Sequence, residues 1–278
     1  MQKVHYIISG ANNLPISIDL SSINDQTKKP LVIFCHGFKG FKDWGAWNLV
    51  ANKFANNNFI FLKFNFSHNG TSPNSLEDFE NITAFSENNY SKELLDLQLV
   101  IDWAKSDEFP LKNSWNQKVF LIGHSRGCGA VLVKNGEEEI VNKTCTWSAI
   151  DSFDRFGTKA QIKQWGIDGE HIFTNGRTGQ KMPIKYQFYT DYLKYIKRLN
   201  IKNTVQKNLK PLLIIHGKDD PAVHIDSARN LYSWSKNAQL IEIDNADHVF
   251  GSKHPFQEEV LPIHLENISD LTIKFFNK

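Results

Sequence analysis

The chain contains the segment Val119-Phe120-Leu121-Ile122-Gly123-His124-Ser125-Arg126-Gly127-Cys128-Gly129-Ala130. Four apolar residues that favour strands lead into a Gly-x-Ser-x-Gly motif, and the small residues after it can open a helix. This pattern predicts a strand, a sharp turn and a helix, with Ser125 at the turn. A serine on such a turn projects its hydroxyl away from the backbone, where a base can reach it. We therefore predict that Ser125 is a nucleophile.

The residues around Ser125 fit the same chemistry. A Cβ at Gly123 or Gly127 would collide with the neighbouring strand or helix, so both positions are expected to require glycine. The backbone amide of Arg126 is expected at the start of the helix, where it would point to the place at which an oxyanion forms. We therefore predict that this amide is one donor of an oxyanion hole.

Composition limits the classes of protein to which the chain can belong. With 278 residues, 41% hydrophobic and 22% charged, it is typical of a soluble globular protein with one large α/β domain or two small ones. The net charge of +2 indicates neither a nucleic-acid nor a membrane partner. Cys35, Cys128 and Cys145 lie in apolar or small-residue segments, which favours buried free thiols in a reducing compartment.

The N-terminal segment bears on localisation. Met1–Tyr6 lacks the apolar run of a signal peptide, and the chain has no apolar stretch of about 18 residues that could span a bilayer. These patterns predict a cytoplasmic protein, with the alternative that a leader has already been removed. The sequence is compatible with a monomer or a homodimer.

Apolar runs and helical spacings alternate along the chain. Residues 4–9 and 16–20 predict an antiparallel hairpin at a sheet edge. Strands are predicted at 30–35, 59–66, 119–122, 144–150, 211–215 and 239–243, and helices at 46–57, 90–105, 225–236 and 256–277. Ser91 is the predicted N-cap of the second of these helices. Alternation of this kind predicts a mostly parallel, doubly wound sheet.

Residues 152–209 interrupt the alternation after the sixth strand. We predict a cap over the active-site edge of a core formed by residues 1–151 and 210–278. Within the cap, residues 171–184 predict a hairpin and residues 186–199 a helix. Residues 151–205 hold ten Lys or Arg against five Asp or Glu. This excess indicates either a solvated helix face or a basic rim that attracts anionic acyl substrates.

A serine hydroxyl is a poor nucleophile until a base accepts its proton, so a histidine is needed. His36 and His124 lie in turn motifs beside glycine and His216 ends a strand, and these three are expected to be structural. His248 follows the last strand, in a loop at the carboxyl edge of the sheet. We predict that His248 is the base.

The base needs a carboxylate that fixes its tautomer and stabilises the imidazolium. Asp219 and Asp220 follow the strand at 211–215, on the same edge, and we prefer Asp220, with Asp151 as a third candidate. The second amide of the oxyanion hole is predicted at Phe38, after His36-Gly37 at the end of an adjacent strand.

Four motifs in this order resemble the α/β-hydrolase superfamily over nearly the whole chain. They are His36-Gly37-Phe38, Gly123-His124-Ser125-Arg126-Gly127, His216-Gly217-Lys218-Asp219-Asp220 and Asp247-His248. His36-Gly37-Phe38-Lys39-Gly40 with Phe64-Asn65-Phe66 is similar to the dienelactone-hydrolase and feruloyl (cinnamoyl) esterase-like branch, which also carries an insertion after the sixth strand. Two features depart from that branch: Arg126 replaces the commoner Gln or Met, and residues 67–72 replace a Gly-x-Gly loop.

The resemblance implies an α/β-hydrolase fold and a catalytic triad of Ser125, Asp220 and His248, with the amides of Phe38 and Arg126 as the oxyanion hole. It implies hydrolysis of carboxylic esters of small acyl groups, aromatic ones among them, through an acyl-enzyme on Ser125, with no cofactor and no metal. The alternatives are a peptidase-like or thioesterase serine hydrolase and a catalytically silent binding protein.

Aromatic residues are frequent in the predicted cap. They are Phe153, Phe156, Trp165, Phe173, Tyr186, Phe188, Tyr189 and Tyr192. They fit either a pocket for an aromatic acyl group or a small core of the cap itself.

Overall fold

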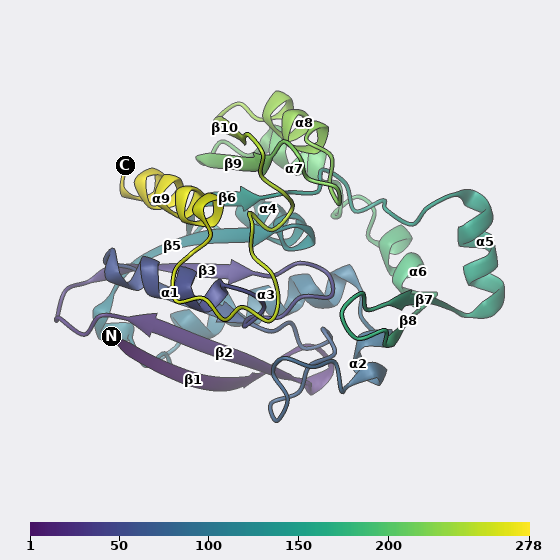
Figure 1. Ribbon diagram of the computed structural model, residues 1–278, viewed down its shortest axis with the longest axis horizontal. Helices are drawn as coiled ribbons and strands as arrows, with labels where there is room; N and C mark the ends of the chain where they lie inside the picture. The colour runs from purple at the N-terminus through teal and green to yellow at the C-terminus, as the bar shows by residue number, and fades with distance from the viewer.

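A computed structural model describes residues 1–278, with an eight-stranded sheet at its centre (Figure 1). The strand order is β1-β2-β4-β3-β5-β6-β9-β10. The strands are β1 (Gln2–Ser9), β2 (Pro15–Ser22), β3 (Lys29–Cys35), β4 (Ile60–Phe64), β5 (Trp115–His124), β6 (Val141–Trp147), β9 (Leu212–Gly217) and β10 (Ala238–Ile243). β2 is antiparallel to β1 and to β4, and all other neighbours are parallel. The predicted edge hairpin and mostly parallel sheet are confirmed.

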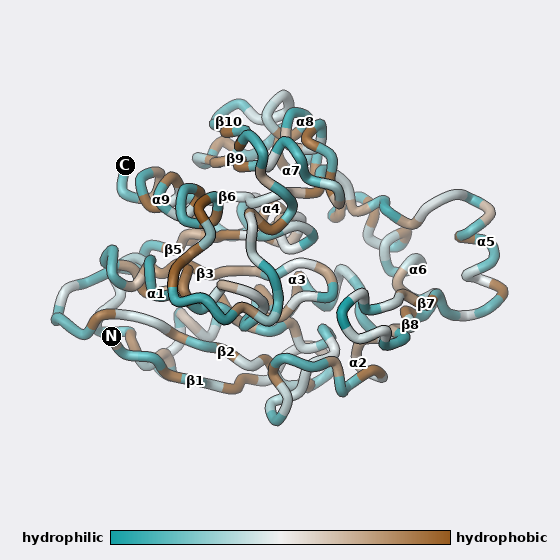
Figure 2. Tube along the Cα trace, viewed as in Figure 1, coloured by the Kyte–Doolittle hydropathy of each residue, from teal (hydrophilic) through white to brown (hydrophobic).

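Helices cover both faces of the sheet, and each face has its own apolar core. On one face α1 (Trp47–Asn56) and α9 (Ile263–Asn277) pack over alternate strand residues such as Val32 and Phe34. On the other face α3 (Tyr90–Lys105), α4 (Arg126–Glu137) and α8 (Asp226–Trp234) pack over Leu31 and Ile33. Because successive strand residues point to opposite faces, a central strand must be apolar throughout. Figure 2 shows brown along β3 and along part of β5.

The segment between β6 and β9 leaves the sheet and then returns to it, because β6 and β9 are direct neighbours. It contains α5 (Lys159–Asp168), the antiparallel hairpin of β7 (Glu170–Thr174) and β8 (Lys181–Lys185), α6 (Gln187–Lys194) and α7 (Ile201–Lys207). In Figure 1, α5, β7 and β8 lie together at the end of the molecule toward which the β3 and β6 arrows point. The predicted hairpin is confirmed. α7 packs against α4 and α8 of the main body, and the exact limits of a cap at 152 and 209 stay a prediction.

Several predicted ends of elements were wrong. β6 ends at Trp147 and not at residue 150, because Ser148 has a positive φ of 52° that breaks the extended run. α9 begins at Ile263 and not at 256, directly after Pro262. α6 ends at Lys194 and not at 199.

The predicted N-cap of α3 was also wrong. The cap is Asn89, whose side chain accepts a hydrogen bond from the amide of Lys92 at 2.9 Å. Ser91 lies in the first turn, and its hydroxyl donates to Asp191 of α6 at 2.9 Å. The side chain predicted to cap the helix therefore ties the helix to the inserted segment instead.

The three cysteines are free and buried. None of the helices combines the length and the apolar character that crossing a bilayer requires.

Candidate active site

Ser125 occupies a strained turn between β5 and α4. Its backbone has φ 55° and ψ −121°, a conformation that residues with a Cβ rarely adopt. The amide of Ser125 donates to the carbonyl of Trp147 at 2.9 Å, and the amide of Cys128 donates to the carbonyl of Ser125 at 3.0 Å. These bonds to β6 and to α4 hold the turn in place. The predicted strand, turn and helix are therefore confirmed.

The two glycines of the motif allow the close packing that this turn needs. A Cβ at Gly123 would lie 2.6 Å from the Cα of Cys128. A Cβ at Gly127 would lie 2.5 Å from the carbonyl oxygen of His36, and would also meet that of Cys35. Both distances fall well inside van der Waals contact, so each position requires glycine, as predicted.

His248 and Asp220 meet at the carboxyl edge of the sheet. The Nδ1 of His248 donates a hydrogen bond to the Oδ2 of Asp220 at 2.7 Å. The Oδ1 of Asp220 accepts from the amides of Ala222 and Val223 at 2.8 and 2.9 Å. Asp220 is buried, which acts to raise the pKa of its carboxyl, but the hydrogen bonds from His216 and His248 hold that pKa well below its usual value. The carboxylate is therefore ionised and fixed in direction.

The two competing aspartates lie elsewhere. Asp219 is exposed, and its backbone amide donates to the carbonyl of Ala246. Asp151 accepts hydrogen bonds from Ser227 and Asn230 of α8. Of the three candidate acids, the structure brings only Asp220 to His248.

Ser125 and His248 line the same cavities, and no hydrogen bond joins them in this structure. Such bonds are often long in free enzymes and tighten when substrate binds. The Nε2 of His124 donates to the carbonyl of His248 at 2.9 Å, with the two rings 4.9 Å apart. Burial lowers the pKa of His124 to about 3, so it stays neutral and holds the loop of His248 beside Ser125.

Phe38 and Arg126 both offer a backbone amide beside Ser125. Neither amide donates a hydrogen bond to any group of the protein. A Cβ at Gly37 would lie 2.9 Å from the Cβ of Ser125, so the chain that carries the Phe38 amide passes directly beside Ser125. His36 fixes this turn, because its Nδ1 donates to the carbonyl of Gly37 at 2.9 Å. The predicted structural place of His36 agrees with this contact.

The side chain of Arg126 contacts both α3 and Phe38, and the sequence did not reveal these contacts. Its guanidinium forms an ion pair with the buried Glu93 of α3 and lies 4.2 Å from the centre of the Phe38 ring. Glu93 also accepts from the side chain of Asn88 at 2.9 Å. Contact between the guanidinium and the aromatic ring ties Arg126 to Phe38 through their side chains.

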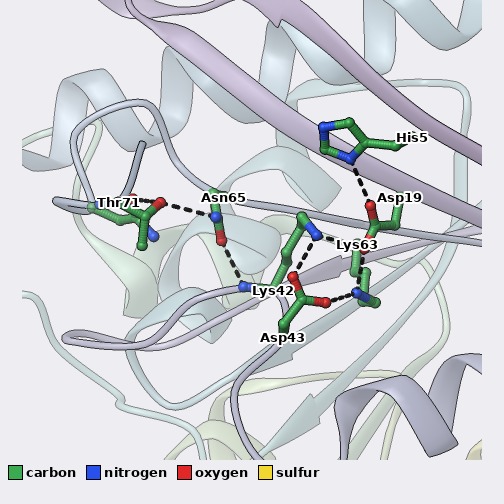
Figure 3. Close-up of polar contacts among 8 residues, drawn as sticks. His5, Asp19, Lys42, Asp43, Lys63, Asn65 and Thr71 are labelled. Carbon is green, nitrogen blue, oxygen red and sulfur yellow. Dashed lines mark hydrogen bonds and ion pairs between the residues drawn. The ribbon is translucent and has the colours of Figure 1, made fainter. Parts of the chain in front are cut away.

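Four charged side chains hold the loop that follows Phe38 (Figure 3). The ammonium groups of Lys42 and Lys63 lie between the carboxylates of Asp19 and Asp43, and each lysine contacts both carboxylates. Both lysines are 1% exposed. Burial acts to raise the pKa of Asp19, but the charges of Lys63 and Lys42 hold it well below its usual value. We call these four residues the buried charge cluster.

The buried charge cluster is joined to a second polar contact. The amide of Lys42 donates to the side chain of Asn65 at 2.6 Å, and Asn65 donates to the hydroxyl of Thr71 at 2.9 Å (Figure 3). The loop of residues 67–72, which stands in place of a Gly-x-Gly loop of the branch that the sequence resembles, is thereby tied to the loop after Phe38. A lysine within the apolar run of β4 was the one signal of this cluster in the sequence.

Two cavities adjoin Ser125, and both are also lined by Phe38 and His248. The smaller, of about 320 Å³, extends toward Trp44 and Arg177. The larger, of about 510 Å³, extends under the inserted segment. The inserted aromatic residues Phe156, Trp165, Phe173 and Phe188 line the larger cavity. The other four predicted ones, Phe153, Tyr186, Tyr189 and Tyr192, do not line it. The inserted segment therefore has both a cavity wall and a small core of its own.

No family model matches this chain, and no curated protein matches it by sequence. Solved structures match it over nearly its full length. The esterase domain of a Rhodothermus marinus protein is 18% identical with a TM-score of 0.67, covering 99% of this chain and 98% of that one. Est1E from Butyrivibrio proteoclasticus is 20% identical with a TM-score of 0.67, covering 98% and 97%.

A third structure is an alpha-beta serine hydrolase homologue from Coxiella burnetii, which is 14% identical with a TM-score of 0.61, covering 99% of this chain and 98% of that one. The chain has the α/β-hydrolase fold. At these identities the likeness concerns the fold, and the predicted fold class is confirmed. In this chain, Ser125, Asp220 and His248 follow strands β5, β9 and β10 at the carboxyl edge of the sheet.

Proposed function

We propose that the protein is a serine hydrolase that cleaves carboxylic esters through an acyl-enzyme on Ser125. The observation that carries the proposal is the 2.7 Å hydrogen bond from His248 to the buried Asp220, at an edge where Ser125 sits on a strained turn in the same cavity. A binding protein would need neither the strained turn nor the paired base. The esterases among the solved structures with this fold support the same assignment.

In the proposed mechanism His248 acts as general base. Its Nδ1 is bonded to Asp220, so its Nε2 is unprotonated and free to accept the hydroxyl proton of Ser125. The Ser125 oxygen then attacks the ester carbonyl carbon, and the imidazolium that forms is stabilised by the Asp220 carboxylate. His248 returns the proton to the departing alcohol, and the acyl group remains on Ser125. Water, activated by His248 in the same way, hydrolyses the acyl-enzyme.

The amides of Phe38 and Arg126 are the proposed donors to the oxyanion. Both lie beside Ser125 and have no acceptor within the protein. Such preorganised donors stabilise charge that develops only in the transition state, typically by about 3–4 kcal/mol for one donor. The ion pair of Arg126 with Glu93 and the contact of its guanidinium with the Phe38 ring would keep both amides in place.

The larger cavity is the proposed acyl site and the smaller one the proposed alcohol site. Aromatic rings line much of the larger cavity, which suits an apolar or aromatic acyl group. Est1E has also been solved with ferulic acid bound, which supports an aromatic acid among the acyl groups to be tested. Residues 152–209 are the proposed cap over this site.

Hydrolysis of a p-nitrophenyl ester series from acetate to octanoate, together with methyl ferulate, tests the proposal. We expect wild type to release p-nitrophenol, with an optimum chain length that reports the size of the acyl site. Ser125→Ala is expected to lower turnover by at least about ten thousandfold, because it removes the nucleophile.

Three outcomes would contradict the proposal as stated. Turnover that survives in Ser125→Ala would exclude an acyl-enzyme on this serine. Inactivity on every ester, combined with activity on an amide or thioester panel, would reassign the protein to the peptidase-like or thioesterase class. Inactivity on all three panels would favour a binding protein.

A further inference from the structure

The larger cavity beside Ser125 contains no carboxylate. None of the residues that line it is Asp or Glu. Two arginines, Arg126 and Arg155, line it. Most of the remaining wall is apolar or aromatic, and Arg155 lies at the solvent-exposed edge of the cavity. A cavity of this kind favours a ligand with negative charge, provided that one of the two arginines is not already neutralised.

The positive charge of Arg126 is neutralised by a buried carboxylate. Its guanidinium is paired with the buried Glu93, and its charge also faces the ring of Phe38. This ion pair has no net charge, so Arg126 contributes packing and hydrogen-bond donors but little attraction for an anion.

Arg155 is the charge without a partner. Its guanidinium forms no ion pair, and the only hydrogen bond of this side chain donates from Nη2 to the carbonyl of Ala222 at 3.2 Å. The amide of Ala222 in turn donates to Asp220, so Arg155 lies against the loop that carries the proposed catalytic acid. A single bond to a carbonyl leaves the other N–H donors of the guanidinium available, and such a fork matches a carboxylate in geometry.

A polar side chain, that of Gln161, lines the same cavity. The Oε1 of Gln161 accepts from the amide and the hydroxyl of Thr158, at 2.8 and 3.0 Å, and this fixes the side chain. The remaining amide nitrogen of Gln161 has no acceptor in the protein, and Gln161 lines the cavity with Arg155. The inserted segment thus brings a cation and a neutral donor to a cavity that is otherwise largely aromatic.

We propose that the acyl site selects acyl groups that end in a carboxylate, and that Arg155 binds this carboxylate. The substrates would be monoesters of dicarboxylic acids, with the apolar carbon skeleton between the aromatic walls and the free carboxylate at Arg155. Hydrolysis would consume one water and release an alcohol, a dicarboxylate and one proton. This inference rests on the proposed ester hydrolysis at Ser125 and names the substrate class of that site.

Paired substrates of equal length test the inference. The monomethyl esters of succinate, glutarate, adipate and suberate are compared with the methyl esters of the monocarboxylic acids of matching chain length. For wild type, kcat/KM is expected to be higher for the anionic member at the length that reaches Arg155. In Arg155→Met this preference is expected to fall by about tenfold, mainly through a higher KM for the anionic ester, because one charged hydrogen-bonding partner is lost. Arg155→Lys is expected to keep part of the preference.

Lys159→Met is the matched control. Lys159 is an exposed cation of the same inserted segment, and it does not line the cavity. The Lys159→Met substitution is expected to leave the preference for the anionic ester unchanged. A preference that falls equally in Lys159→Met and Arg155→Met would mean that the whole positive segment attracts anions, and would overturn the inference. So would a wild type that prefers the neutral esters at every length.

Binding separates this inference from the proposed function. Calorimetric titration of monomethyl adipate into Ser125→Ala is expected to show binding, and the same titration into Ser125→Ala/Arg155→Met is expected to show a Kd at least about tenfold weaker. Binding that depends on Arg155, without turnover by wild type, would refute the esterase and retain the carboxylate site. Turnover of neutral esters without Arg155-dependent binding would retain the esterase and refute the carboxylate site.

Discussion

Asp220→Asn is expected to lower kcat/KM for a neutral p-nitrophenyl ester by about ten thousandfold. The substitution keeps an oxygen that can accept from the amides of Ala222 and Val223, so the loop should remain folded. It replaces the oxygen that accepts from His248 by an NH₂ group, or turns the amide so that the loop loses its acceptor. The imidazole would then hold its proton on the nitrogen that faces Ser125, where it cannot act as a base. Steady-state kinetics with a far-ultraviolet circular dichroism spectrum would check both activity and folding.

Asp219→Asn is the matched control for Asp220→Asn. The two residues are neighbours and carry the same charge, but the side chain of Asp219 is exposed and does not contact His248. Its kcat/KM is expected to stay within about twofold of wild type, as is usual for a surface substitution away from the chemistry. Equal losses in both variants would mean that the acid acts through the general field of the loop. A larger loss in Asp219→Asn than in Asp220→Asn would mean that Asp219, and not Asp220, is the acid.

Lys42→Met is expected to lower the free energy of unfolding by about 3–5 kcal/mol. The methionine has similar length, so the change removes the charge more than the volume. Asp19 and Asp43, which are only partly exposed, would then share the ammonium group of Lys63, with His5 as the further partner of Asp19, and part of their negative charge would be uncompensated. Urea unfolding at neutral pH, followed by tryptophan fluorescence, gives the free energy directly.

The matched control for Lys42→Met is Lys53→Met. Lys53 pairs with Glu266 and Asp270 of α9, and both of these carboxylates are more than half exposed. Surface ion pairs contribute about 0–1 kcal/mol, so this variant should be nearly as stable as wild type. If Lys42→Met also lost less than about 1 kcal/mol, the carboxylates of the buried charge cluster would have to be hydrated, and the cluster would not be what holds the loop after Phe38.

The parts of the candidate site that follow from local sequence were predictable. Ser125 sits in a motif whose strand, turn and glycines are read within a dozen residues, and His248 and Asp220 each follow a recognisable strand. Parallel strands bring their carboxyl ends to one edge, so the order of motifs was enough to expect these side chains together. Their catalytic roles remain the proposal that the variants above test.

The parts that depend on side chains far apart in sequence were not predictable. Glu93 lies within a helix whose periodicity says nothing about Arg126, which is 33 residues away. Asp19 likewise meets Lys63 across 44 residues. The N-cap of α3 was missed for a different reason, since Asn89 and Ser91 are both good capping residues and only the backbone shows which one adopts the extended conformation.

Labelling with a fluorophosphonate probe tests the central claim most directly, because such probes react with a serine only when a base activates it. We predict that wild type gains the mass of one probe per chain, that peptide mapping places it on Ser125, and that Ser125→Ala gains none. A folded wild-type protein that stays unlabelled, or one that is labelled at another residue and equally in Ser125→Ala, would contradict the account.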